Sequence, residues 1–211
     1  MASLVSAGGG LEERHSVDPS YAPLKDQYLM FPMLEHDFEN WNSLGSAIFL
    51  NNKAVITMIT PEAKNRKGLI HTREPNPNYK HWYAALDFNI GRDKIKELNQ
   101  AGEGMAIYYL RNFDSADPQI NENFYGFIDN FDGIGIFVNT VQTSAEQQQR
   151  KTSKLVGVSS FINDGQRRVK EHKKHQTCYR ELTGSHLAFS KIAIEYESPT
   201  LTVSVYDHGS Q

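Results

Sequence analysis

The sequence predicts an all-β fold, built as an antiparallel β-sandwich or a barrel. Short runs of β-forming residues alternate with turn residues from about residue 30 to the end of the chain. Two of these runs, Trp82–Ile90 and Leu201–Val205, place their large apolar residues at every second position. Helical patterns are scarce. Many short strands with little helix favour two packed sheets or one closed sheet.

The predicted strands follow one another at short spacing. They are Ser46–Leu50, Ala54–Ile59, Gly68–Thr72, Trp82–Ile90, Gly104–Leu110, Gly133–Val141, Lys154–Phe161, Lys191–Glu197 and Thr200–Tyr206. In the Trp82–Ile90 strand the even-numbered residues share one face, and in the last strand the apolar residues are odd-numbered. Ser198-Pro199, between the last two strands, predicts a tight hairpin turn.

Three segments are predicted to lie outside the strands. Arg92–Gln100 has the pattern of a short helix, and the polar Lys170–Tyr179 segment predicts a loop. Residues 1–30, which contain three consecutive glycines and two prolines, predict a flexible N-terminal arm. We therefore expect one domain over residues 31–211.

The composition is that of a globular protein. With 211 residues and 39% hydrophobic residues, the chain is long enough to bury a substantial core. The formal net charge of -3 gives no general attraction to nucleic acid. The one cysteine, Cys178, excludes a disulfide within this chain. No apolar run reaches the length of a membrane helix, and the N-terminus lacks the pattern of a signal peptide.

Patterns that indicate an enzyme are missing from the sequence. No pair of carboxylates has the spacing that a retaining glycosidase needs on its strands. The chain also lacks a Gly-x-Ser-x-Gly nucleophile motif and a phosphate-binding glycine loop. His172, His175 and Cys178 suggest zinc, but their spacing differs from that of zinc sites, and a solvated basic loop is the favoured interpretation. The sequence thus predicts a protein that is not an enzyme.

Two strands with several glycines carry a polar residue at one end. Glu103 precedes the Gly104–Leu110 strand, and Asn139 lies near the end of the Gly133–Val141 strand. All-β proteins place binding sites at the rim of a sheet, because the sheet holds polar groups rigidly while loops expose them. Both residues are therefore candidates for a binding site.

Several short motifs occur in the order found in one family. They are Trp41-Asn42 with Gly45 and Ala47, Thr60-Pro61, Gly102-x-Gly104-Met105-Ala106-Ile107-Tyr108-Tyr109, Gly126, Asp132-Gly133-Ile134-Gly135-Ile136-Phe137, Asn163-Asp164-Gly165, Cys178-Tyr179-Arg180 and Leu201-Thr202-Val203. From about Met30 to its end, the chain resembles the L-type (legume-lectin-like) domain of eukaryotic cargo receptors of the early secretory pathway, the ERGIC-53, VIP36 and Emp46/47 family.

This resemblance implies a concanavalin-type antiparallel β-sandwich, a jelly roll with a flat back sheet and a curved front sheet. It further implies residence in the lumen of the endoplasmic reticulum, the ER–Golgi intermediate compartment or the Golgi, and high-mannose glycoproteins as partners. Membrane attachment would come through a segment that this chain lacks, and homo-oligomerisation is left open. Against the family pattern the chain looks truncated at its C-terminus, without its last strands.

The resemblance also implies roles for individual residues. Glu103 occupies the position of an aspartate that binds mannose hydroxyls, and Thr143 that of an asparagine shared between sugar and calcium. Phe161, or Ile162 if the loop is shifted, occupies the position of a sugar-binding histidine. Asn139 replaces one calcium-binding aspartate, Val141 replaces an aromatic residue that offers its carbonyl, and Asp164 matches a second aspartate ligand.

Only one of the two expected carboxylate ligands remains, so we expect calcium to bind weakly or not at all. A simpler interpretation stays open, because Asn139, Thr143 and Asp164 are residue types that commonly form turns. An exposed loop aromatic such as Phe127 or Phe161 is a candidate for stacking on a sugar. The main hypothesis is a non-enzymatic, mannose-type carbohydrate-binding domain. The alternative is a degenerate lectin fold that acts as a protein-interaction scaffold without sugar binding.

Overall fold

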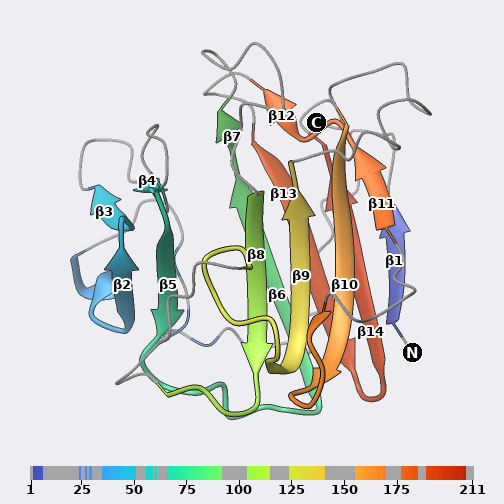
Figure 1. The fold of residues 1–211 in the computed structure, drawn as a ribbon. Coiled ribbons are helices and arrows are strands. Elements are labelled where there is room, and N and C mark those ends of the chain that lie inside the picture. Colours follow the sequence, from blue (N-terminus) through green and yellow to red (C-terminus); the bar gives the residue numbers. More distant parts are fainter. Residues whose placement is uncertain are drawn as a thin grey trace. The chain divides into compact units, whose positions relative to one another are not determined.

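A computed structural model describes residues 2–6, 24, 27, 29, 35–50, 56–58, 60, 66–91, 104–114, 124–140, 155–169, 177–184 and 189–207 (Figure 1). The chain divides into two compact units. The larger, which we call the sandwich unit, comprises Met1–Pro19, Lys80–Arg111 and Asn130–Gln211. The smaller unit comprises Ser20–Tyr79 and Asn112–Asp129.

The sandwich unit contains two four-stranded sheets. The first sheet has the strand order β1 (Ala2–Ser6), β14 (Thr200–Tyr206), β13 (Ser190–Glu197) and β6 (His81–Phe88). The second sheet has the order β11 (Thr177–Arg180), β10 (Val156–Asp164), β9 (Asp132–Asn139) and β8 (Gly104–Leu110). Neighbouring strands are antiparallel, except that β1 runs parallel to β14. A short parallel pair, β7 (Ile90–Gly91) and β12 (Thr183–Gly184), completes the unit.

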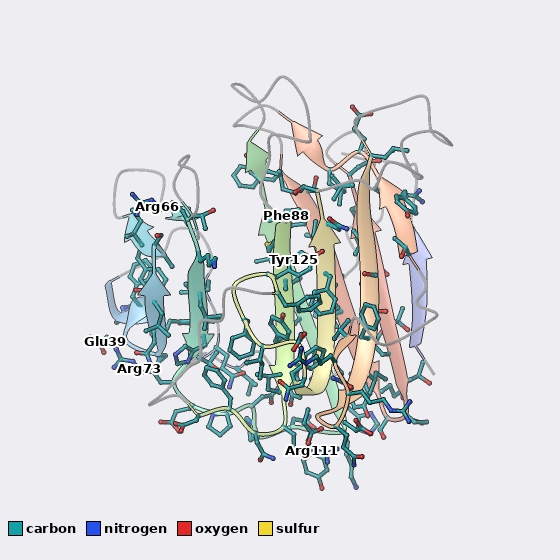
Figure 2. All side chains as sticks on the ribbon, in the orientation of Figure 1. Glu39, Arg66, Arg73, Phe88, Arg111 and Tyr125 are labelled. Carbon is teal, nitrogen blue, oxygen red and sulfur yellow. The ribbon has the colours of Figure 1, made fainter. Side chains whose placement is uncertain are left out.

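The core lies between these two sheets, because each sheet turns one set of alternating residues inward. On β14, Leu201, Val203 and Val205 are fully buried, as the alternation in the sequence predicts. Residues of the second sheet complete the same apolar cluster, namely Ile134, Ile136, Val138, Val156 and Val158. Figure 2 shows Phe88, another member of the cluster, at the end of β6. The predicted β-sandwich is confirmed.

One aromatic contact links the two sheets directly. Trp82 of β6 stacks on Tyr109 of β8 with ring centroids 4.4 Å apart. Burial raises the pKa of the Tyr109 phenol, and the neighbouring Tyr196 raises it further. The phenol thus stays neutral far above physiological pH, which suits its position against the core.

The described strands of the smaller unit form two antiparallel pairs. Strand β2 (Trp41–Gly45) pairs with β5 (Gly68–Thr72), and β3 (Ile48–Leu50) pairs with β4 (Ile56–Met58), all antiparallel. A short 3-10 helix, η2 (Glu35–Phe38), precedes β2. Gly45 has a φ of 65°, and a Cβ there would lie 2.5 Å from the backbone oxygen of Lys67, so this position requires glycine. Phe38 on Phe49 and Phe113 between His71 and Phe127 provide ring contacts within the unit.

Most predicted strands are confirmed, with Gly68–Thr72, Gly104–Leu110 and Thr200–Tyr206 matching end to end. The hairpin at Ser198-Pro199 is also confirmed, between β13 and β14. Two predictions are wrong in part. Residues 2–6 form β1, not a flexible arm, because their backbone pairs with the edge of β14. Thr177–Arg180 forms β11, although Lys170–Tyr179 was expected to be a loop, because these residues pair with the first half of β10.

The expected helix at 92–100 lies outside the described residues, and so do 170–176 of the expected loop. Within the part of the chain that the structure describes, no helix has the length and apolar character needed to cross a membrane.

Replacing Leu201 by alanine should destabilise the chain by about 2–5 kcal/mol, because the leucine is fully buried between the sheets and its removal leaves a cavity. Thr200→Ala, at the exposed neighbouring position, should cost less than about 0.5 kcal/mol. Urea unfolding followed by circular dichroism measures both. Equal losses for the two variants would contradict the placement of the core.

Candidate functional site

The upper end of the second sheet in Figure 1 holds one residue predicted to belong to the site. Asn139 ends β9 there, and it pairs with Gly104 at the start of β8 and with Gly157 of β10. Glu103 and Thr143, the two predicted sugar-binding residues nearest in sequence, lie outside the described residues. Glu103 immediately precedes Gly104, which is the first described residue of β8.

Asn139 lies in a row of side chains that crosses the sheet from strand to strand. The pairing puts Gly104, Asn139, Gly157 and Tyr179 side by side, on the face that points away from the core. We call these four residues the Asn139 row. Its two glycines carry no side chain, so backbone forms the floor beside the Asn139 amide, and this floor is exposed at Gly104 and buried at Gly157. Asn139 itself is half-buried.

Tyr179 covers the floor at one end of this row. A Cβ added to Gly157 would lie 3.3 Å from the Cε1 atom of Tyr179 and 3.3 Å from a methyl carbon of Thr177. The ring therefore lies against the glycine, and a larger residue at 157 would crowd it. At the other end, Gly104 has a φ of 129°, and a Cβ there would lie only 1.9 Å from the carbonyl oxygen of Val138. Gly104 is therefore required, whereas a side chain at 157 would have to shift the Tyr179 ring or the Thr177 methyl group.

An aromatic layer covers the middle of the same outer face. Tyr108, Phe131, Phe137 and Phe161 meet there, with ring centroids 5.2 Å apart for Tyr108–Phe131 and 5.4 Å apart for Phe137–Phe161. Gly135 lies beneath them, since a Cβ at that position would come within 2.6 Å of Phe131 and 2.8 Å of Phe137. Edge-to-face contacts of this kind stabilise by about 0.5–1.5 kcal/mol each beyond burial.

This layer changes the interpretation of two aromatic residues. Phe161 was expected to be an exposed loop residue, but it lies within β10, is half-buried and packs on Phe137. Phe127 is only 4% exposed, so it is not an exposed stacking surface either. Phe161 shares the outer face with Asn139, but it lies four positions along β10 from Gly157, roughly 14 Å along the strand.

Strand pairing separates the two residues of the predicted metal site, Asn139 and Asp164. Asp164 ends β10 and pairs with Asp132 at the beginning of β9, whereas Asn139 is the last residue of β9. They thus lie at opposite ends of the eight-residue strand β9, a separation of about 24 Å. The lower end also carries the ion pair of Arg111 with Asp132, at 3.5 Å, beyond the end of β8 (Figure 2).

Asp164 instead stabilises a turn. Its Oδ1 accepts a hydrogen bond from the backbone N–H of Gln166 at 3.0 Å, and Gly165 follows with a φ of 77°. The Gly165 N–H donates to the carbonyl oxygen of Phe131, which fastens this turn to the segment before β9. The simpler interpretation from the sequence, that Asp164 is a turn-forming residue, is therefore the one that the geometry supports.

The described residues do not assemble a calcium site. No three His, Cys, Asp or Glu side chains come together in the part of the chain that the structure describes. Asn139 has a neutral amide and its strand neighbours are glycines, so the Asn139 row offers no carboxylate of its own. The proposed histidine–cysteine zinc triad lies mainly outside the described residues, apart from Cys178 on β11.

Sequence reasoning missed Tyr179 as a residue of this face. It was placed in a polar loop, because the lysines and histidines before it obscure the short β-forming run Thr177–Tyr179. Gly157 between two valines was the available signal for a covering side chain, because glycine within a strand often marks a close approach by another group.

Comparison with known proteins gives one family and several relatives. The model of the legume-like lectin family matches residues 24–211. The chain is similar to the VIP36-like protein of Homo sapiens, 27% identical over 125 residues that cover 59% of this chain and 32% of that protein. The VIP36-like protein of Bos taurus matches to the same extent.

The L-type lectin-like domain-containing protein C126.08c of Schizosaccharomyces pombe is 27% identical over 110 residues, 52% of this chain and 32% of that protein. The matched part thus corresponds to about a third of the length of these relatives. No solved structure matches significantly.

Replacing Asp164 by alanine should lower stability by about 0.5–1.5 kcal/mol, because the Gln166 N–H loses its acceptor. Asp164→Asn keeps an acceptor oxygen and should retain most of that stability. Urea unfolding with and without calcium measures the effect. A loss of stability that appears only with calcium present would restore Asp164 as a metal ligand.

Proposed function

This chain belongs to the legume-like lectin family, and we propose that it binds carbohydrate without chemically changing it. The observation that carries the proposal is the family match over residues 24–211, which covers both sheets of the β-sandwich apart from β1. The absence of paired catalytic carboxylates and nucleophile motifs in the sequence agrees with a binding role.

We place the binding site at the end of the second sheet that holds the Asn139 row. The row offers an amide between an exposed glycine, Gly104, and a buried one, Gly157, against which the ring of Tyr179 lies. Amide and carboxylate groups recognise sugar hydroxyls by hydrogen bonds, and a rigid sheet holds them in place before the ligand arrives. Glu103, which directly precedes the row, would accept hydroxyl hydrogen bonds, and Thr143 would supply a further hydroxyl. Phe161 remains a more remote candidate on the same face.

The finer assignments follow the resemblance of the sequence to cargo receptors. We propose mannose-type glycans as the ligand and high-mannose glycoproteins as the partners. The proposed role is glycoprotein transport in the lumen of the endoplasmic reticulum, the intermediate compartment and the Golgi. The names of the relatives support a lectin of the VIP36 type, and the matched part is only about a third of their length.

A second function is supported by the substitutions in the metal loop. Asn139 stands where the family pattern has a carboxylate ligand, and Asp164 lies at the other end of the sheet. A fold in which one ligand is replaced and the other lies at the opposite end of the sheet is suited to act as a protein-interaction scaffold without sugar affinity. The two functions differ in one measurable property, which is whether the folded chain binds any glycan.

A glycan array separates these two functions. We expect the chain to bind mannose-type glycans, and Glu103→Ala to weaken that binding by at least about tenfold, because a charged hydrogen-bond acceptor is lost. Asp164→Ala is the matched control, since it removes a carboxylate from the opposite end of the sheet and should leave glycan binding unchanged. A folded wild-type chain that binds no glycan would support the scaffold function instead.

Calcium should have little effect on the chain. We expect titration calorimetry to detect weak calcium binding or none, and glycan binding to persist in the presence of a chelator, because an anionic ligand of the family pattern is replaced by Asn139. Magnesium at the same concentration controls for ionic strength. Calcium binding with a dissociation constant in the micromolar range would contradict this expectation and indicate a functional calcium site.

A further inference from the structure

The outer face of the first sheet carries a second arrangement of polar and aromatic residues. Strand pairing aligns its outward side chains in rows across β6, β13 and β14. The three central rows are Tyr83–Glu195–Thr202, Ala85–Ala193–Ser204 and Asp87–Lys191–Tyr206. The side chains between them along β13, such as Ile192 and Ile194, point into the core.

The middle row consists of small residues and lies between two rows of large ones. This arrangement leaves a hollow lined by Tyr83, Ala193, Glu195, Thr202, Ser204 and Tyr206. Ala193 faces outward and is nevertheless only 7% exposed, because the longer side chains around it cover its methyl group. Tyr83 comes from one side of the hollow and Tyr206 from the other, so the two rings border the same floor.

The hollow has a negative electrostatic environment. The outward positions of these strands carry the carboxylates of Asp87, Glu195 and Glu197 and the ammonium of Lys191. Lys191 Nζ lies 3.7 Å from Asp87 Oδ1, on the row beyond the floor. The carboxylate that lines the hollow itself is that of Glu195.

The phenol of Tyr83 lies in the same environment. Burial raises the pKa of its phenol, and the neighbouring Tyr206, Asp87 and Glu195 raise it further. The carboxylates of Asp87 and Glu195 favour a positive charge nearby, whereas burial disfavours a charge of either sign.

We propose that this hollow binds the guanidinium group of an arginine side chain presented by a partner protein. A planar guanidinium can lie against tyrosine rings and donate two parallel hydrogen bonds to one carboxylate. Here Tyr83 and Tyr206 supply the rings and Glu195 supplies the carboxylate, while the hydroxyls of Thr202 and Ser204 can accept further hydrogen bonds. An ammonium group lacks the planar shape that two bordering rings favour.

This inference does not depend on glycan binding. The hollow lies on the outer face of the first sheet, and the Asn139 row lies on the outer face of the second. The core of the sandwich separates the two faces. A partner held through arginine could therefore be bound while a glycan occupies the other face.

The test titrates the full chain with two short, terminally blocked peptides and follows amide resonances by NMR. One peptide is Gly-Arg-Gly, and the other carries citrulline, which keeps the shape of arginine but has no charge. We expect the arginine peptide to shift resonances of β13 and β14 around Ala193 and Thr202. The citrulline peptide should bind at least about tenfold more weakly, because the charge-assisted hydrogen bonds are lost.

A pair of matched variants locates the interaction. Glu195→Gln should weaken arginine binding by at least about tenfold, whereas Glu197→Gln should weaken it less than about threefold. Both glutamates are exposed on the same face of β13 and lose the same charge, but only Glu195 lines the hollow. Both variants should fold, because exposed substitutions rarely disturb stability.

Three results would overturn the proposal. Equal losses in the two variants would indicate attraction to net charge alone. Equal binding of the citrulline peptide would exclude recognition of the guanidinium. Mannose that shifts the same resonances and displaces the arginine peptide would assign the hollow to sugar. Because glycan binding at the other sheet is measured on the array with Glu103→Ala, failure of either proposal can be recognised separately.

Discussion

The alternation of side chains along the central strand β9 is the constraint on which the sandwich unit depends. Ile134, Ile136 and Val138 point into the core, where they meet residues from the first sheet. The residues between them point outward and include Gly133, Gly135, Phe137 and Asn139. A shift of one residue in the pairing would exchange these two sets and bury the Asn139 amide in apolar surroundings. The core and the outer face are therefore determined together.

Glycines adapt this strand to its neighbours. Gly133 has a φ of 145°, and a Cβ there would lie 2.2 Å from the carbonyl oxygen of Tyr109, so β9 can approach β8 only without a side chain at that position. Gly135 makes room for Phe131 and Phe137, which lets an aromatic layer form on the outer face of the sheet. The same use of glycine recurs at the Asn139 row, where Gly104 approaches the backbone of β9 and Gly157 lies against the Tyr179 ring. Glycine thus allows close packing at several places in this sheet.

On both outer faces of the sandwich unit, small residues lie next to larger polar and aromatic side chains, but the polar groups differ. On the second sheet, glycines make a floor around an amide, with an aromatic ring against one end. On the first sheet, the small row of Ala85, Ala193 and Ser204 makes a floor between two tyrosines and a carboxylate. The first arrangement suits neutral polyhydroxyl ligands, and the second suits a planar cation. Separation by the core allows the two faces to act independently.

Much of the fold was predictable from the sequence, because the alternation of apolar and polar residues over a few positions indicates both a strand and its buried face. The burial of Leu201, Val203 and Val205 follows directly from their spacing. Strand β1 was not predicted, because its pairing with β14 joins residues at opposite ends of the chain. Strand β11 was missed because its polar neighbours suggested a loop, whereas its backbone hydrogen-bonding partner on β10 decided its conformation.

The candidate site was predicted less well, for a related reason. The sequence alone determined the class of fold, the family and the identity of the polar residues at the ends of strands. Only the tertiary structure decided which end of the sheet each of them occupies. Asn139 and Asp164 are 25 positions apart in the chain, and local patterns do not reveal that β10 continues through Asp164 to the opposite rim. The register between strands, set by backbone hydrogen bonds over the whole sheet, placed Tyr179 in the same row as Asn139, across Gly157, and kept Asp164 away from it.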